Sequence, residues 1–147
     1  MSQVAPAATA VGAAVAWLWL GMVLAISFLE APLKFRTPGL DLRTGLAIGR
    51  LVFKALNAVE AVLAVAVVVL LVIGAPGPVA LTGGAIAVVV LVGQLLGVRP
   101  ALARRSDAVL AGADGPRSHA HLAYVALEIV KVVALVVLGA ALLGTLA

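Results

Sequence analysis

The feature that most constrains this chain is an apolar run that carries charges, residues 46–73. The run, LAIGRLVFKALNAVEAVLAVAVVVLLVI, is long enough to cross a bilayer, because about 20 mainly apolar residues in a helix span the hydrocarbon core. It also contains Arg50, Lys54, Asn57 and Glu60. A charged side chain at the centre of a bilayer costs at least ~2.5 kcal/mol on insertion scales. A helix that keeps several charges therefore needs partners for them or a use for them.

The composition places the whole chain in lipid. Hydrophobic residues make up 65% of the chain and charged residues 11%, whereas soluble domains have about 45–50% and about 25%. The absence of cysteine excludes disulfides and thiolate metal sites. The net charge of +4 does not indicate nucleic acid, because the basic residues lie in or beside apolar segments. They are typical of topology signals and of contacts with anionic lipid headgroups, so the expected partners are membrane lipids.

Four apolar runs predict four membrane spans in a single integral membrane domain, residues 1–147. The first run has no basic start, which favours a retained span over a cleaved signal peptide. Trp17 and Trp19 within it are candidates for interfacial anchors. The Pro- and Gly-rich residues 74–78 predict an antiparallel hairpin between the second and third spans. The predicted spans are residues 11–30, 46–73, 79–98 and 119–143.

The third span contains Gly83, Gly84 and Gly93, which give it small faces where another helix can pack closely. Because four short spans enclose little volume, these faces are also expected to serve in a homo-oligomer. Gln94 is the strongly polar residue of this span's interior.

The distribution of basic residues predicts the orientation. Lysine and arginine occur in the loop between spans one and two, in the loop between spans three and four, and in span segments on that side. The positive-inside rule makes that side cytoplasmic and puts both termini outside. We therefore predict an all-α, four-helix transmembrane bundle, N-out and C-out. Arginine outnumbers lysine and Ala, Val, Gly and Leu dominate, which favours a multi-pass protein of a bacterial inner (plasma) membrane.

Helical periodicity gathers polar residues on one side of three spans. At about 100° per residue, Ser27 shares a side of span one with two charged residues, and similar sides form on spans two and four. With no water to solvate them, these sides should turn toward each other and form a polar seam. The residues predicted for this seam are Glu30, Lys34, Arg50, Lys54, Asn57, Glu60, His121, Tyr124, Glu128 and Lys131.

The charges of the seam can balance in more than one way. Glu128 and Lys131 are three residues apart and can pair locally, while equal depth favours Glu60 with Lys131. Arg50 with Glu30 would close the cytoplasmic mouth. Two interpretations stay open: the seam is a set of ion pairs that specifies helix packing, or it is a polar pathway or pocket that opens toward the cytoplasm.

Other sites are poorly supported by the sequence. His119 and His121 point about 200° apart on a helix, so both can chelate one ion, with help from Asp114, only if the helix starts after them. We predict instead a helix N-terminus at the headgroup level and no metal site. The two histidines cannot ligate haem from two helices of one subunit, so no cofactor is expected. No Ser–His–acid cluster and no glycine-rich phosphate loop occurs, which argues against an enzyme. Asp107 is expected to be solvated in its basic loop.

Several short segments of the chain together resemble a known family. They are 17–21 (WLWLG), 49–53 (GRLVF), Arg99-Pro100, 105–107 (RSD) and the His-containing start of 119–143. These segments and the layout resemble the transmembrane protein 205-like group of small four-helix membrane proteins, a family of unknown function. The resemblance implies a membrane fold and brings no reaction or substrate. The chain departs from the group at residues 30–35, at Glu128 and at Lys131, which indicates a distinct bacterial subfamily.

Three functional hypotheses follow. The first is a membrane protein that handles a small solute, an ion or a proton through the seam. The second is a non-catalytic accessory or scaffold subunit in which the seam is structural. The third is a haem- or quinone-linked membrane oxidoreductase that uses His121 with Tyr124.

Overall fold

The computed structural model describes residues 3–113 and 119–147, which form four long helical rods and no strand. The first rod consists of α1 (Val4–Val23), the π-helical segment η1 (Leu24–Glu30) and α2 (Ala31–Lys34). The second is α3 (Leu42–Gly74). The third consists of α4 (Pro78–Gly93), the π-helical segment η2 (Gln94–Val98) and α5 (Arg99–Leu110), and the fourth is α6 (His119–Gly144).

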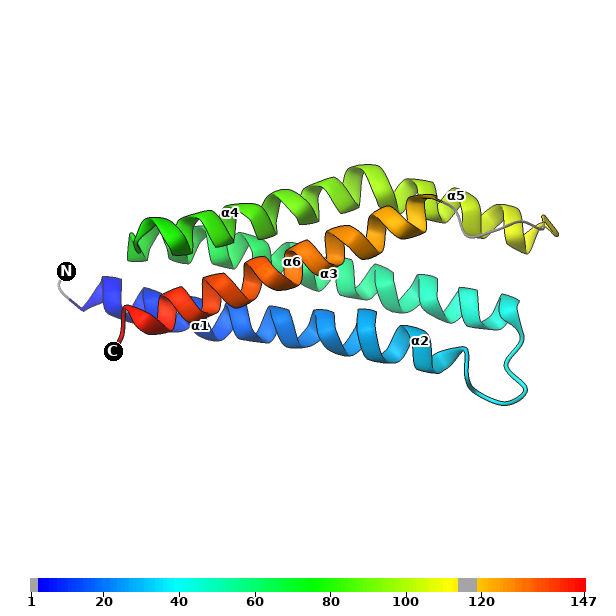
Figure 1. The fold of residues 1–147 in the computed structure, drawn as a ribbon, viewed down its shortest axis with the longest axis horizontal. Coiled ribbons are helices and arrows are strands. Elements are labelled where there is room, and N and C mark those ends of the chain that lie inside the picture. Colours follow the sequence, from blue (N-terminus) through cyan, green and yellow to red (C-terminus); the bar gives the residue numbers. More distant parts are fainter. Residues whose placement is uncertain (1–2, 114–118) are drawn as a thin grey trace.

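All four rods are long and apolar enough to cross a membrane, so the prediction of an all-α, four-helix transmembrane bundle is confirmed. They run side by side along the long axis of the molecule (Figure 1). Both described ends of the chain and the turn between α3 and α4 lie at one end of the bundle. The last residues of α2 and α5 and the first residues of α3 lie at the other end, which we call the basic end because these segments contain lysine and arginine.

The helices extend beyond the predicted spans at several ends. The first predicted span ends at residue 30, but Pro32 lies in the first turn of α2, where a missing N–H is tolerated. The rod therefore continues to Lys34. On the third rod, Pro100 occupies the equivalent position in α5. Each proline is the second residue after a π-helical segment, so each rod changes pitch just before its proline and continues past it.

Small residues bring the helices into contact. In a bilayer, helices associate through close packing and interhelical hydrogen bonds, since lipid is as apolar as their side chains. A Cβ on Gly83 would lie 3.1 Å from the backbone of Ala134 in α6, and one on Gly84 would contact Leu71 of α3. The glycine face that we assigned to a homo-oligomer is thus used within the chain, whereas Gly93 has open space beside it.

The turns follow their local sequence. Asp41 caps the start of α3, where its side-chain Oδ1 accepts a hydrogen bond of 2.6 Å from the backbone N–H of Thr44. Ala75 ends α3 in the left-handed region, with φ 43°. The next helix begins three residues later at Pro78. Spans two and three are therefore joined by the short hairpin that the sequence predicts.

Candidate functional site

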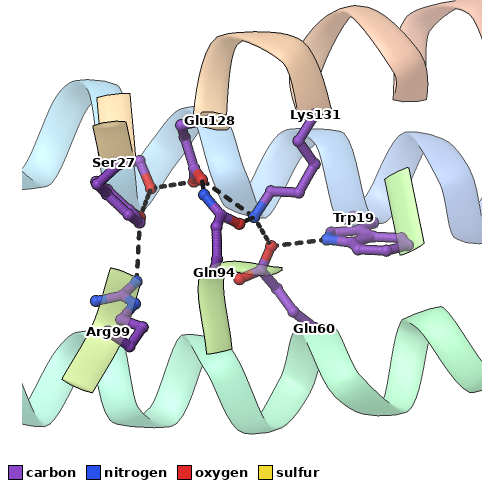
Figure 2. A network of polar contacts seen from close by, with 8 residues as sticks. Trp19, Ser27, Glu60, Gln94, Arg99, Glu128 and Lys131 are labelled. Carbon is purple, nitrogen blue, oxygen red and sulfur yellow. Dashed lines mark hydrogen bonds and ion pairs between the residues drawn. The ribbon is translucent and has the colours of Figure 1, made fainter. Parts of the chain in front are cut away.

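A buried chain of polar side chains links all four rods near the middle of the bundle, and we call it the polar network (Figure 2). Glu60, Gln94, Glu128 and Lys131 are each 2% exposed or less, although lipid-embedded helices offer little solvation for them. The polar network consists of Trp19 and Ser27 of the first rod, Glu60 of α3, Gln94 and Arg99 of the third rod, and Tyr124, Glu128 and Lys131 of α6.

Lys131 is the centre of the network. Its Nζ donates to Glu60 Oε1 at 2.5 Å and to Gln94 Oε1 at 2.8 Å, and it lies 3.1 Å from Glu128 Oε2. An ammonium has three N–H groups, so these three contacts use all of them. Trp19 Nε1 also donates to Glu60 Oε1, at 2.9 Å. One cation therefore serves two carboxylates, and an indole helps to hold one of them.

A second branch leads from Glu128 toward the basic end. Ser27 Oγ donates to Glu128 Oε1 at 2.7 Å, and its oxygen lies 3.3 Å from the hydroxyl of Tyr124. Because the single Ser27 proton points to Glu128, Tyr124 must be the donor in the second contact. Arg99 Nη2 in turn donates to the Tyr124 oxygen at 3.1 Å. Every hydrogen bond of this branch thus points toward Glu128.

Aromatic rings surround the cation of this branch. The Arg99 guanidinium lies 4.4 Å from the centre of the Phe53 ring and 4.6 Å from that of Tyr124. Such distances are typical of cation–π interactions, worth about 0.5–2 kcal/mol. Phe53 and Tyr124 contact edge to face, with their centres 5.9 Å apart. The rings shield the half-buried Arg99 where the branch approaches the basic end.

The charges of the polar network balance over its whole length. With ionised carboxylates, the pair Glu60 and Glu128 has one negative charge more than Lys131 can compensate. Arg99 supplies the second positive charge, separated from Glu128 by Tyr124 and Ser27. This arrangement avoids a net buried charge, which is costly in a low-dielectric interior.

Both π-helical segments contribute directly to the network. Ser27 lies inside η1, and Gln94 is the first residue of η2. A π-helical turn is rare and often occurs at functional sites, since it changes the direction of side chains along a helix. Here the changes of pitch occur where two rods present hydroxyl and amide groups to Glu128.

No family model, curated protein or solved structure matches this chain. The function therefore has to be inferred from the site itself.

The structure brings four of the predicted seam residues together: Glu60, Tyr124, Glu128 and Lys131. The predicted pairing of Lys131 with Glu60 is confirmed, and so is its local pairing with Glu128. Both pairings exist at once, because the two carboxylates approach the same ammonium.

The predicted pairing of Arg50 with Glu30 is wrong. Arg50 forms an ion pair with Asp107 of α5, and both side chains are substantially exposed. Glu30 instead pairs with Lys34 on the next turn of its own rod, Nζ to Oε1 at 3.2 Å. The extended third rod carries Asp107 to Arg50, and the uninterrupted first rod keeps Glu30 and Lys34 in register.

Three other predicted seam residues lie outside the network. Lys54 is exposed, and Asn57 and His121 are only half-buried. On α3 the buried stripe follows Leu56, Glu60 and the later apolar residues, and Lys54 lies about 120° away from Glu60 on that helix. Of the polar residues predicted on α3, Glu60 is the one that faces the core.

Trp19, Gln94 and Arg99 belong to the polar network, although we did not predict them for the seam. Trp19 is not an interfacial anchor, since it is fully buried and bonded to Glu60, whereas Trp17 is 40% exposed. Gln94 brings the third rod into a seam that we assigned to the other three. Helical periodicity could have identified Trp19 and Gln94. Trp19 lies three residues after Ala16 and Gln94 lies four residues after Val90, so each shares the side of its helix with the small buried residues.

The metal and haem hypotheses gain no partner residues. Within residues 3–113 and 119–147, no three His, Asp or Glu side chains form a group that could hold a metal ion. Asp114, which we considered beside the histidines, lies outside the described residues.

Proposed function

We propose that this integral membrane protein binds and releases a proton at Glu128, which exchanges it with the basic end of the bundle. The observation that carries this proposal is the directed branch from Arg99 through Tyr124 and Ser27 to Glu128. Hydroxyl groups both donate and accept hydrogen bonds, so two of them in a row can pass a proton to a carboxylate. An ionisable residue within a membrane is a functional candidate by default.

The transfer is balanced as follows. The Ser27 proton moves to Glu128 Oε1, and the Tyr124 hydroxyl proton moves to Ser27 Oγ. Tyr124 then takes up a proton from a hydronium ion at the basic end, which becomes water. Arg99 stays charged throughout, because its guanidinium does not deprotonate in proteins. Its role is to position the Tyr124 oxygen. Release of the proton follows the same steps in reverse.

A proton suits the polar network better than a larger solute does, because the side chains of the network contact one another directly. The grooves on the surface have other linings: one of about 520 Å³ lies between α4 and α6 and includes Ile86 and Val133. Another, of about 400 Å³, lies between α3 and α5. Neither is lined by a residue of the polar network.

Glu128 exchanges its proton with one side of the membrane, and the proton does not pass across to the other side. Beyond Glu60, toward the end where both termini lie, the buried residues of α3 are apolar: Leu63, Ala64, Val67 and Leu71. At about 1.5 Å per residue, this stretch covers about 20 Å between Glu60 and Gly74. An apolar layer of that thickness opposes proton movement to the far side.

Infrared spectroscopy of the protein in lipid vesicles tests the proposal. The C=O stretching band of a protonated carboxyl that is shielded from water lies apart from those of solvated carboxyls, so titration should produce a buried-carboxyl band that Glu128→Gln removes. Following a pH jump, the band should appear more slowly in Ser27→Ala and Tyr124→Phe, which each remove one hydroxyl. Thr9→Val is the matched control, because the Thr9 hydroxyl bonds only to the backbone oxygen of Ala5, far from the network.

A band that persists in Glu128→Gln, or no such band while the protein stays folded, would refute the proposal. Equal rates in Ser27→Ala and in the Thr9→Val control would contradict the role of the branch. Size-exclusion chromatography of each variant shows whether it is folded before the infrared measurement.

A second candidate is a non-catalytic accessory or scaffold subunit, in which the polar network only specifies helix packing. One observation favours it: the network draws at least one residue from each of the four rods. In that case the infrared titration gives no carboxyl band, while removal of Lys131 still unfolds the protein. The two candidates therefore differ in the spectrum and not in the stability.

For the orientation we propose that the basic end is cytoplasmic, with both termini outside a bacterial inner membrane. The support is the distribution of lysine and arginine, since the positive-inside rule retains such loops in the cytoplasm. A reporter active only in the cytoplasm, fused after Ala147, should stay inactive. An active reporter would reverse the orientation.

A further inference from the structure

A groove between α3 and α5 combines two cations with apolar walls. It has a volume of about 400 Å³ and shares no residue with the polar network. Its lining consists of Ala47, Arg50, Leu51 and Lys54 of α3 and Leu110 of α5. Arg50 and Lys54 are four residues apart, so both cations project from the same face of one helix.

The depth of the groove follows from the length of α3. At about 1.5 Å per residue, the segment from Lys54 to Gly74 is about 30 Å long, which equals the thickness of the hydrocarbon core. With Gly74 at one membrane surface, the Lys54 backbone lies at the opposite boundary of the core. Arg50 lies one turn, about 6 Å, further out, at the level of the lipid headgroups.

The positive charge in the groove exceeds the negative charge. Lys54 is exposed and has no hydrogen bond or ion pair with any of residues 3–113 and 119–147. Arg50 binds Asp107 through one nitrogen, Nη1, and its guanidinium has further N–H donors. Two cations thus face one carboxylate at the boundary between the hydrocarbon core and the headgroups. An anion at the headgroup level would complete the balance.

We propose that this groove binds one phospholipid with an anionic headgroup, whose phosphate lies between Arg50 and Lys54. Basic pockets between transmembrane helices at this level suit acidic headgroups. Leu51 and Leu110 contact the apolar part of the headgroup region, and the acyl chains descend along the face that Lys54 begins. That face continues into the membrane as the exposed residues Ala58, Val62 and Val65.

Native mass spectrometry tests the proposal on the whole protein. The protein is released from micelles that contain equal amounts of phosphatidylglycerol and phosphatidylcholine, and the retained lipids are counted. The wild type should retain one phosphatidylglycerol in preference to phosphatidylcholine. Each lost cation should weaken that preference about fivefold, since a basic residue near an acidic membrane surface contributes about a factor of this size.

The variants separate the groove from general basicity. Lys54→Gln and Arg50→Gln should each weaken the preference, whereas Arg43→Gln, at an exposed position of the same helix outside the groove, should leave it unchanged. Asp107→Asn should strengthen the preference, because it removes the competing carboxylate. Because the last change acts in the opposite direction, general damage to the fold cannot explain the whole set.

Three results would overturn the proposal. The first is a preference for phosphatidylglycerol that is unchanged in Lys54→Gln and Arg50→Gln. The second is an equal loss in Arg43→Gln. The third is displacement of the bound lipid by millimolar inorganic phosphate, which would assign the groove to a free anion and not to a lipid headgroup.

Discussion

Lys131 of α6 and Glu60 of α3 lie 2.5 Å apart, Nζ to Oε1, and each side chain is 1% exposed. Both residues lie about 20 Å along their helices from the end of the bundle that lacks basic loops. The same ammonium also lies 3.1 Å from Glu128 Oε2. Two carboxylates thus depend on one cation, so the three charged residues should not respond equally to substitution.

Lys131→Met should be the most damaging single change in the polar network. It leaves two buried carboxylates facing each other, and the loss of one partner from a buried ion pair costs about 3–5 kcal/mol. Glu60→Gln should cost less than half as much, because Lys131 keeps Glu128 and the amide oxygen still accepts from Trp19. The free energy of unfolding in detergent measures both effects.

The double variant Lys131→Met with Glu60→Gln supplies the control. It removes one of the two carboxylates that the single variant leaves unpaired, so it should recover part of the lost stability. Equal losses in Glu60→Gln and Lys131→Met would show that Lys131 is not shared between the two acids.

The two tryptophans should report opposite environments. Trp19 is fully buried and Trp17 is 40% exposed on the lipid-facing side of the same helix. Brominated lipids quench indole fluorescence on contact, so they should quench Trp19→Phe, in which only Trp17 remains. They should leave Trp17→Phe nearly unquenched. Strong quenching in Trp17→Phe would place Trp19 at the lipid surface and separate it from Glu60.

The architecture could be predicted from the sequence because apolar run length is a sufficient signal for a membrane helix. The same reasoning predicted the buried ion pairs of Lys131, since residues without water must find each other. The prediction was wrong for the relative positions of Lys54 and Glu60. We placed the polar residues of α3 on one common side, whereas Glu60 lies on the side of the buried apolar residues. Leu56, Leu63 and Val67 determine which side of α3 is buried, and Glu60 shares that side.

The contact of Arg99 with Tyr124 could not be derived from the sequence. Arg99 follows the π-helical segment η2, and a π-helical segment shifts the angular position of every later residue on its rod. A constant 100° per residue therefore gives wrong directions beyond Leu24 and Gln94. The pairing of Arg50 with Asp107 was missed for a related reason, since it requires the third rod to continue through Pro100.

Gly83→Ala should destabilise the bundle, whereas Gly93→Ala should not. A Cβ at Gly83 would lie 3.1 Å from Ala134 O and from Leu138 N, so the backbones of α4 and α6 would have to separate. A Cβ at Gly93 meets no atom within 4 Å. Since alanine favours a helix over glycine by about 0.5–1 kcal/mol, Gly93→Ala should be neutral or stabilising. Thermal unfolding of the two variants measures the difference, and equal unfolding temperatures would contradict the close contact.

The start of α3 should depend on acid pH through Asp41, which lies just outside the membrane span. The hydrogen bond from the backbone N–H of Thr44, reinforced by the Thr44 side chain, lowers the pKa of Asp41 below its ordinary value of 3.8. Because the folded pKa is the lower one, the capped state is favoured in full above pH 3.8. The advantage is lost as the pH falls through the lowered pKa, where protonation removes the charge that binds the N–H.

Hydrogen exchange of the Thr44 amide, measured by NMR in micelles, provides the test. In the wild type, protection of this amide should be constant at neutral pH and fall only below pH 3.8. Asp41→Asn should give protection that does not change with pH, because asparagine caps a helix without titrating. Asp41→Ala should leave the amide unprotected at every pH, since alanine is a poor cap. Wild-type protection that falls already above pH 3.8 would show that Asp41 does not bind this N–H as a carboxylate.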